Sequence, residues 1–392
     1  MVKAMSGIES LGDSSSLAPS LRAAWVQRLA LGFVTLFGSA LFFLGTSWDI
    51  QWHTFIGRDR TLIPPHQMML TGVALSGIAA LVAVIIETVW IRRNRSLEKY
   101  TTSFAESFYG SLGAYIAGFA ALNAAVAFPL DAYWHALYGI DVAIWAPFHV
   151  MFVMGMAIVA LGAAYMLVSA ARLAQGAGAV RAKRVAYVGV IVALATMLSN
   201  LTILLFDAMF DHAINLQVVT VNVYPVLSGI VVALILIAAT YAVPWRWAAT
   251  SVAGIYLAFA GIVAVFVPPA TYWLVALEHL SFRPDRDGNP GLASVALEWP
   301  IGVVITAILI DVFMRRAQRK DWSPRKLTIV LIVVTLLGSL PMPVIYPIFP
   351  VLLVNDLGVP SFVVSLLVGL LGAFMGLWFG RNVGTSMRSL ER

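Results

Sequence analysis

Long apolar segments recur along the whole chain and alternate with short polar ones. Ten of these segments are predicted to be helices that cross the roughly 30 Å hydrocarbon core of a bilayer. They lie at residues 25–48, 66–91, 109–130, 148–171, 185–207, 223–243, 247–268, 299–314, 327–345 and 361–380. The pattern therefore predicts an all-α polytopic membrane protein.

The short linkers between these segments group the predicted helices into five consecutive hairpins. The hairpins occupy residues 25–91, 109–171, 185–243, 247–314 and 327–380, and a tail follows at 381–392. Residues 1–24 are polar and rich in serine, without an apolar core followed by a cleavage site. We expect the first span to be an uncleaved anchor and not a signal peptide.

Composition supports a membrane protein and excludes several kinds of chemistry. Of the 392 residues, 60% are hydrophobic and only 11% are charged, which is too little charge to cover the surface of a soluble protein. The chain contains no cysteine. Disulfides, thiolate metal sites, iron–sulfur clusters and cysteine nucleophiles are therefore excluded, and any metal must be held by other side chains.

The basic residues predict how the chain is oriented. The formal net charge is +6, but 21 of the 25 Lys and Arg residues lie in the N-terminal part of the chain, the linkers between hairpins and the C-terminal tail. Such segments are typically cytoplasmic, which places both termini inside and the turn of every hairpin outside. We expect a bacterial plasma-membrane protein whose basic residues meet anionic lipid head groups, and no nucleic-acid partner.

All six histidines are predicted to lie at or in the outer turns. They are His53, His66, His135, His149, His212 and His279. Six tryptophans lie near the same face and are predicted to form an interfacial aromatic belt. These are Trp48, Trp52, Trp134, Trp145, Trp273 and Trp299.

The first two outer turns repeat one pattern. Residues 49–66 contain Asp, Trp, His, Gly, Asp, Pro and His in an order that residues 131–149 repeat. The offset is 82 residues as far as the second Asp, and one extra residue precedes the second His. Seven matches within so short a stretch indicate duplication of a helix-turn-helix unit, as is common in membrane proteins.

The spacing of this pattern predicts two metal sites. Asp49 and His53 are four residues apart and share one helix face, and the proline-started helix that follows returns His66 to the same depth. Two imidazoles and a carboxylate form a plausible three-ligand divalent site with an open position. The second hairpin offers the equivalent set at positions 82 or 83 residues later, namely Asp131, His135 and His149.

Four further residues of the repeat are expected to support these ligands. Asp59 and Asp141 are candidate hydrogen-bond acceptors for the outer nitrogen of a ligand imidazole. Trp52 and Trp134, each between the Asp and His of its turn, can shield the site from water. The alternative is that all these groups only cap helix ends and hydrogen-bond across a tight turn.

The later hairpins are interpreted as degenerate copies. Asp207, Asp211 and His212 keep the four-residue spacing but place Asp where the first His stood, so they predict at most a weak third site. The fourth outer turn contains Glu278 and His279 beside an exposed loop, and the fifth is rich in proline.

Polar residues within the spans have simpler predicted roles. Asn123 and Asn200 are expected to hydrogen-bond between helices. Methionines near the histidines are expected to fill apolar space, although sulfur can also bind copper(I). Two acidic residues near predicted cytoplasmic helix ends are expected to pair with the arginines that follow them, Glu87 with Arg92 and Asp311 with Arg315.

At these residues the chain resembles a known family. The patterns Asp49-x3-His53-x12-His66 and Asp131-x3-His135-x13-His149 resemble the two metal-binding hairpins of the C subunit of the particulate methane and ammonia monooxygenases. The similarity covers residues 25–171 only, and Asp131 stands where the methane-oxidising family has Asn. The chain also has three further hairpins and no soluble copper-binding domain.

The resemblance implies copper at an outer membrane face and the oxidation of a small apolar molecule or ammonia with dioxygen, with additional membrane or periplasmic subunits as partners. Zinc or iron could occupy the same ligands. Three alternatives remain: a membrane transporter or metal-handling permease, a non-catalytic assembly subunit, and a haem protein, the last disfavoured because carboxylates accompany both histidine pairs.

Overall fold

The computed structural model describes residues 14–57, 60, 62–139, 144–211, 213–284, 300–339 and 358–389. Within them, eight helices are long and apolar enough to cross a membrane. These are α1 (Ser14–Phe55), α2 (Pro64–Arg93), α3 (Leu112–Tyr138), α4 (Pro147–Gly176), α5 (Val180–Asp211), α6 (Tyr224–Ala242), α7 (Ala248–Leu277) and α11 (Gly358–Ser389). The chain is a helical membrane protein, as the hydropathy pattern predicts.

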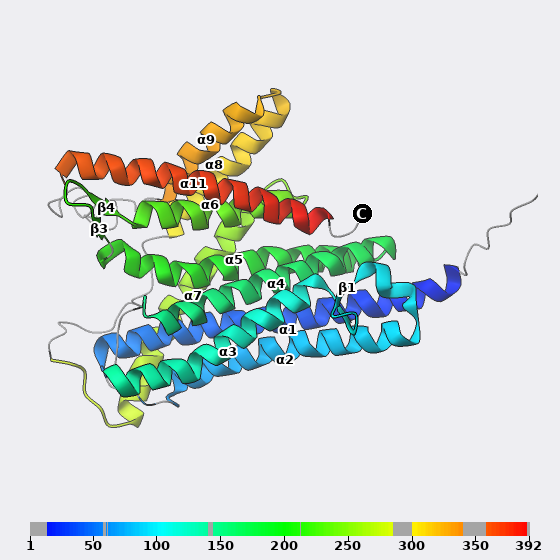
Figure 1. Cartoon of the computed structure of the whole chain (residues 1–392), viewed down its shortest axis with the longest axis horizontal. Helices are drawn as coiled ribbons and strands as arrows, with labels where there is room; N and C mark the ends of the chain where they lie inside the picture. Colours follow the sequence, from blue (N-terminus) through cyan, green and yellow to red (C-terminus); the bar gives the residue numbers. More distant parts are fainter. Residues whose placement is uncertain are drawn as a thin grey trace, which may run out of the picture.

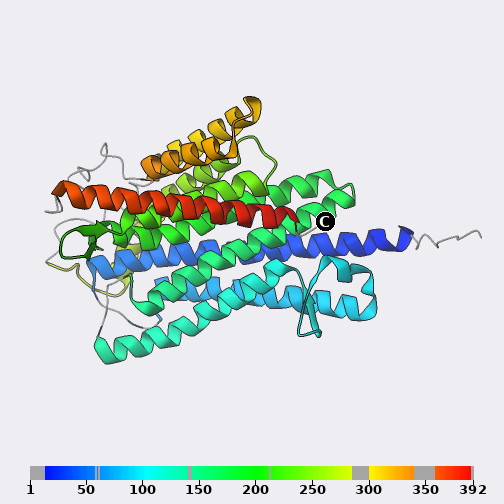
Figure 2. The same ribbon diagram turned by 45° about the horizontal axis from the view of Figure 1, so that its top comes forward.

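The remaining two predicted spans also contain helices, but these helices do not belong to that group of eight. They are α8 (Pro300–Arg319) and α9 (Pro324–Ser339). The 16 residues of α9 extend only about 24 Å at 1.5 Å per residue, and α8 carries Asp311, Arg315, Arg316 and Arg319. In Figures 1 and 2 both lie on the side of the bundle away from α2 and α3.

Two of the linkers form small structures that the hydropathy pattern does not predict. After α2 the chain forms the 3-10 helix η1 (Arg95–Tyr100) and an antiparallel hairpin of β1 (Thr102–Phe104) and β2 (Phe108–Gly110). After α5, β3 (Ala213–Asn215) pairs with β4 (Thr220–Asn222) in a second antiparallel hairpin. The second hairpin lies in the third turn, where the degenerate repeat was predicted.

Helices α1 to α4 form the part of the bundle that positions the histidines (Figure 1). Glycines allow α3 and α4 to touch backbone to backbone. A Cβ atom on Gly162 of α4 would lie 2.5 Å from the Ala117 backbone nitrogen, whereas Gly155 faces Ala120 and Ala124. The earlier residue of α4, Gly155, thus meets later residues of α3 than Gly162 does. This reversed order means that the two helices run antiparallel.

Helix α6 packs against α11 over almost its whole length, although the two are distant in the sequence. A glycine recurs every fourth residue of α11 from Gly372 to Gly384, and these glycines meet the α6 backbone successively from Val226 to Ala238. Small residues at this spacing let helices approach closely within a membrane. The matching order of the contacts means that α6 and α11 run parallel.

Polar residues link the helices as the sequence predicts for the two asparagines, of which Asn123 is exposed and Asn200 is buried. Asn123 Nδ2 donates to the Met151 carbonyl at 3.0 Å and so joins α3 to α4. Asn200 Nδ2 donates to Ser39 Oγ at 3.2 Å, and Ser39 Oγ donates to the Met156 carbonyl at 2.8 Å. This second chain ties α5, α1 and α4 together in the core.

The predicted pairing of Glu87 with Arg92 is wrong. Glu87 instead accepts two hydrogen bonds of 2.8 Å from Arg28 of α1, and both side chains are 2% exposed. Arg28 also donates to Ser169 Oγ and to the Tyr100 carbonyl. A buried guanidinium requires this complete set of acceptors, which the exposed Arg92 does not need.

The prediction that the Asp311 carboxylate pairs with Arg315 is also wrong. Asp311 accepts hydrogen bonds at the start of α7 from the Ala249 nitrogen and from both the nitrogen and Oγ1 of Thr250. Arg315 donates its Nε to the Asp311 backbone carbonyl at 2.9 Å. The carboxylate therefore satisfies free N–H groups of a helix N-terminus.

The contact at Gly162 gives a testable consequence. Replacing Gly162 by alanine is expected to destabilise the protein by about 1–3 kcal/mol, because the added methyl group must push α3 and α4 apart. Gly261→Ala is the matched control, since Gly261 lies within α7 and nothing lies within 4 Å of its added Cβ. Denaturant unfolding in detergent compares the two, and equal stability of both variants contradicts the close contact.

Candidate metal centre

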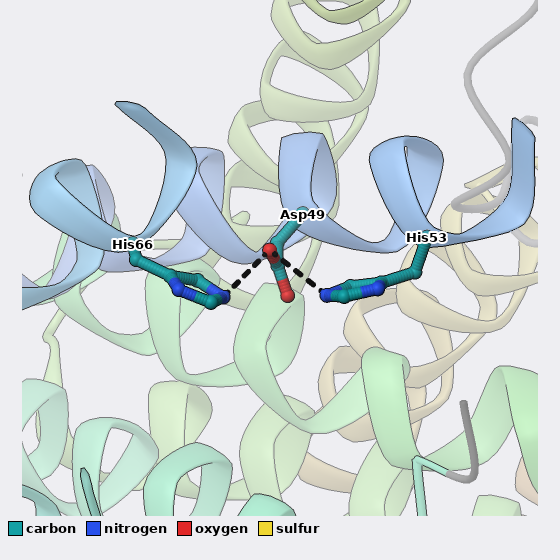
Figure 3. A group of neighbouring side chains, drawn as sticks. All are labelled: Asp49, His53 and His66. Carbon is teal, nitrogen blue, oxygen red and sulfur yellow. Dashed lines mark ion pairs between the residues drawn. The ribbon is translucent and has the colours of Figure 1, made fainter. Parts of the chain in front are cut away.

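The first cluster joins the C-terminal end of α1 to the N-terminal end of α2. Figure 3 shows the rings of His53 and His66 turned toward Asp49 from either side. Asp49 Oδ1 lies 3.0 Å from His66 Nε2 and 3.6 Å from His53 Nε2. The three side chains are only 12–17% exposed.

The second cluster has the same composition, but its two imidazoles contact different oxygens of the carboxylate, whereas both imidazoles of the first contact Asp49 Oδ1. His149 Nε2 lies 3.2 Å from Asp131 Oδ1, and His135 Nε2 lies 3.4 Å from Asp131 Oδ2. In each cluster the three possible ligand atoms lie within 4.8 Å of one another. The structure thus brings together each set of three residues that the sequence pattern selects.

Local structure explains why both clusters form. Helices α1 and α3 extend beyond the predicted spans and include both the Asp and the first His, so the four-residue spacing places both on one face. Gly57 and Gly139 then take positive φ angles of 68° and 84°, which end the helical path. Proline lies in the first turn of α2 and α4, where it has no hydrogen bond to lose.

The ring of His135 has a defined tautomer when neutral. Its Nδ1 lies 3.1 Å from the Gly139 carbonyl oxygen, which can only accept a hydrogen bond. Nδ1 therefore carries the proton, and the Nε2 atom that faces Asp131 presents its lone pair. A lone pair directed at a carboxylate is repulsive unless a cation lies between them or the ring takes a second proton.

Two buried carboxylate oxygens also indicate room for a cation between the imidazoles and the carboxylate. Oδ1 of Asp49 and Oδ1 of Asp131 have no hydrogen-bond partner of proper geometry among the described residues, although both are inaccessible to solvent. Ligand atoms 2.0–2.1 Å from a tetrahedral metal lie about 3.3–3.4 Å apart. The separations of 3.0–3.6 Å between nitrogen and oxygen match that spacing.

The residues predicted to support the ligands have mixed outcomes. Asp59 and Asp141 lie outside the described residues. The acceptor for His135 is the Gly139 carbonyl, which sequence reasoning missed, although its position four residues after the histidine at a helix end was a usable signal. Trp52 is 1% exposed and belongs to the main hydrophobic core, whereas Trp134 contacts Tyr138 with ring centroids 4.4 Å apart and the ring planes tilted by 43°.

The predicted aromatic belt is wrong for two tryptophans. Trp48 is 5% exposed and meets Phe266 of α7 edge-on, and Trp52 is buried beside it in the core. Helix α7 packs against the face of α1 that carries Trp48. This face is therefore buried within the protein and does not meet the lipid head groups. Trp273 is 55% exposed and fits the prediction, and Trp299 lies outside the described residues.

An apolar cluster adjoins the first site. Phe128 meets His66 edge-on at 6.3 Å between centroids and packs against Phe152, which in turn packs against Phe42. Met69 belongs to this cluster and so fills apolar space as predicted. Helices α1 to α4 all contribute residues to this cluster, and it reaches the first site through the contact between Phe128 and His66.

The segment at the end of α7 lies against the turn between α1 and α2. The Arg283 backbone nitrogen donates to the Phe55 carbonyl at 2.8 Å, and Arg60 forms an ion pair with Glu278. These contacts hold the end of α7 beside the turn that joins the first cluster. Glu278, noted in the sequence for its acidity, is thus an ion-pair partner.

The weak third site cannot be placed. The side chains of Asp207 and Asp211 and the whole of His212 lie outside the described part of the structure. His279, the sixth histidine, is exposed with a φ of 52° and belongs to neither cluster.

Comparisons with protein-family models, with curated proteins and with solved structures found no match. The chain is characterised by its own geometry, as a helical membrane protein in which two groups of one aspartate and two histidines could each hold a metal ion.

Proposed function

We propose that the protein is a membrane metalloprotein that binds copper in both clusters and acts as a monooxygenase-like subunit on a small apolar substrate or ammonia. The observation that carries the proposal is the occurrence of two His₂Asp clusters at the ends of membrane helices, each with its three possible ligand atoms within 4.8 Å of one another. Copper, when bound, supplies the binding and reduction of dioxygen. Imidazole and carboxylate ligands suit copper(II), and zinc or iron is the alternative metal.

The residues around the clusters support a catalytic role. Three protein ligands leave an open coordination position for an incoming molecule. Phe128 contacts His66 directly, and Phe152 and Phe42 continue this apolar contact into the core, so the first cluster has an apolar surface against which an apolar substrate could lie. The Gly139 carbonyl fixes the ring of His135 for ligation.

A transporter is less well supported. Secondary transporters usually bind their substrate near the bilayer midplane, between discontinuous helices. Here the ligands lie at the ends of α1 and α3 and the beginnings of α2 and α4. Uptake of metal by proteoliposomes, without substrate oxidation, would favour the transporter.

The decisive experiment measures metal content in purified protein. We expect close to one transition-metal ion per cluster in the wild type, together with a copper(II) electron paramagnetic resonance spectrum that shows coupling to nitrogen. The double variant His53→Ala with His135→Ala should lose nearly all of it, because each cluster keeps only two ligands. His279→Asn is the control, since it removes an exposed imidazole outside both clusters and asparagine tolerates a positive φ.

Two results would contradict the proposal in separate ways. Wild-type protein without stoichiometric metal leaves imidazolium–aspartate hydrogen bonds as the explanation of both clusters. Protein that holds copper but consumes no dioxygen with ammonia or short alkanes retains the metal sites and loses the catalytic role.

A further inference from the structure

A strongly basic cavity lies at the end of the bundle opposite the histidine clusters. It has a volume of 520 Å³ and lies between the C-terminal ends of α6, α8 and α11 and the linker that leads from α6 into α7. A second cavity of 390 Å³ adjoins it and shares Arg246, Arg315 and Arg319 with it. The two together are called the basic cavity, and its cationic residues are Arg246, Arg315, Arg316, Arg319, Lys320 and Arg388.

The charges of this cavity are not neutralised by the protein. None of the six cations forms an ion pair with a carboxylate in the described part of the chain. Asp311 is the acidic residue of the lining, and its oxygens already accept hydrogen bonds from Ala249 and Thr250. In the larger cavity four guanidinium groups face this one carboxylate, which leaves an excess of three positive charges.

One arginine is held in place before any ligand arrives. The Arg315 guanidinium stacks 3.6 Å from the centre of the Trp247 ring, and its Nε donates to the Asp311 carbonyl. Arg246 lies over the same ring at 5.9 Å. Because the ring and the carbonyl hold the guanidinium in place, the terminal nitrogens of Arg315 remain available for an anion. Two such nitrogens can bind a carboxylate or a phosphate in bidentate fashion.

The position of the basic cavity indicates where its ligand comes from. Trp245 and Trp247 are 36% and 40% exposed beside it, at helix ends where membrane proteins usually meet lipid head groups. Basic pockets between transmembrane helices bind the phosphates of anionic lipids. A soluble phosphate compound would share the chemistry but has no need of the flanking tryptophans.

We propose that the basic cavity is a binding site for an anionic lipid whose head group carries two phosphates. The excess of three positive charges exceeds what a single phosphate diester neutralises, and the adjoining cavity extends the cationic surface over the length of a larger head group. The bound lipid joins α6, α7, α8 and α11, which adds a link between the shorter helices and the main bundle.

The test titrates cardiolipin, which has two phosphates, into the purified full-length protein in neutral detergent, with binding followed by native mass spectrometry. Phosphatidylglycerol provides the single-phosphate arm and inorganic pyrophosphate the soluble arm. The triple variant Arg246→Gln, Arg319→Gln and Arg388→Gln should bind cardiolipin roughly 100-fold more weakly, since each basic residue contributes about a factor of five. Phosphatidylglycerol should bind wild-type protein at least about tenfold more weakly than cardiolipin.

The matched control is the triple variant Arg93→Gln, Arg181→Gln and Arg381→Gln, which removes the same charge from exposed positions at the same end of the helices. It should change cardiolipin affinity less than about threefold. Unchanged size-exclusion elution and unchanged metal content of both variants show that they are folded. Equal losses in the two triple variants, or pyrophosphate binding as tight as that of cardiolipin, would overturn the proposal.

Discussion

Replacing His66 by alanine is expected to lower the metal content of the purified protein by half, from about two ions per chain to about one. The first cluster then keeps only Asp49 and His53, and two ligands hold a divalent ion far more weakly than three. Even outer-shell mutations cost roughly 10–100-fold in metal affinity, and the loss of a direct ligand should exceed that. Equilibrium dialysis followed by elemental analysis measures the change.

The second cluster provides the reciprocal measurement. His149→Ala should empty that cluster and leave the first one occupied, so the two single variants should each retain about half of the metal. Gln67→Ala is the matched control, because Gln67 follows His66 directly and, within the described part of the chain, its side chain hydrogen-bonds to the exposed Leu62 carbonyl and to no cluster residue. Full metal content in the His66 variant would remove this residue from the ligand set.

Replacing Glu87 by alanine is expected to produce the largest loss of stability, about 3–5 kcal/mol. The substitution leaves the buried Arg28 guanidinium with Ser169 and Tyr100 as its remaining hydrogen-bond partners among the described residues. An uncompensated buried charge is far more destabilising than the loss of an exposed ion pair. Unfolding of the detergent-solubilised protein by denaturant, followed by circular dichroism, measures the difference.

A double variant separates charge from packing at this pair. Arg28→Met combined with Glu87→Leu removes both charges at similar volume and should recover most of the lost stability, as apolar replacements of buried ion pairs often do. Arg92→Ala is the second comparison, since its exposed side chain contacts the Ser107 carbonyl. A Glu87 variant no less stable than the Arg92 variant would contradict the structural role of the buried pair.

Both histidine clusters could be predicted from the sequence because their geometry is local. Asp49 and His53 share a helix face through the period of the helix, and His66 returns after a turn set by glycine and proline. The same logic held for Asp131, His135 and His149. The pattern did not specify the partner of His135 Nδ1, because several backbone carbonyls near a helix end are equivalent candidates and the sequence only narrows the choice to the residues around Gly139.

The partners of the buried charges could not be predicted, because they depend on the packing of distant helices. Glu87 pairs with Arg28, which is 59 residues away, although Arg92 is nearer in the sequence. Asp311 likewise caps α7, about 60 residues before it. The hydropathy pattern gave the helices but not the two small β-hairpins, because strands of three residues carry no detectable period.

The parallel contact between α6 and α11 bears on how the chain is assembled during synthesis. About 115 residues separate the end of α6 at Ala242 from the start of α11 at Gly358. A ribosome that adds 5–20 residues per second needs about 6–23 seconds to make that stretch. During this interval lipid or a chaperone must cover the surface of α6 that later packs against the glycines of α11. A nascent chain stalled before Gly358 therefore presents the insertion machinery with an incomplete bundle.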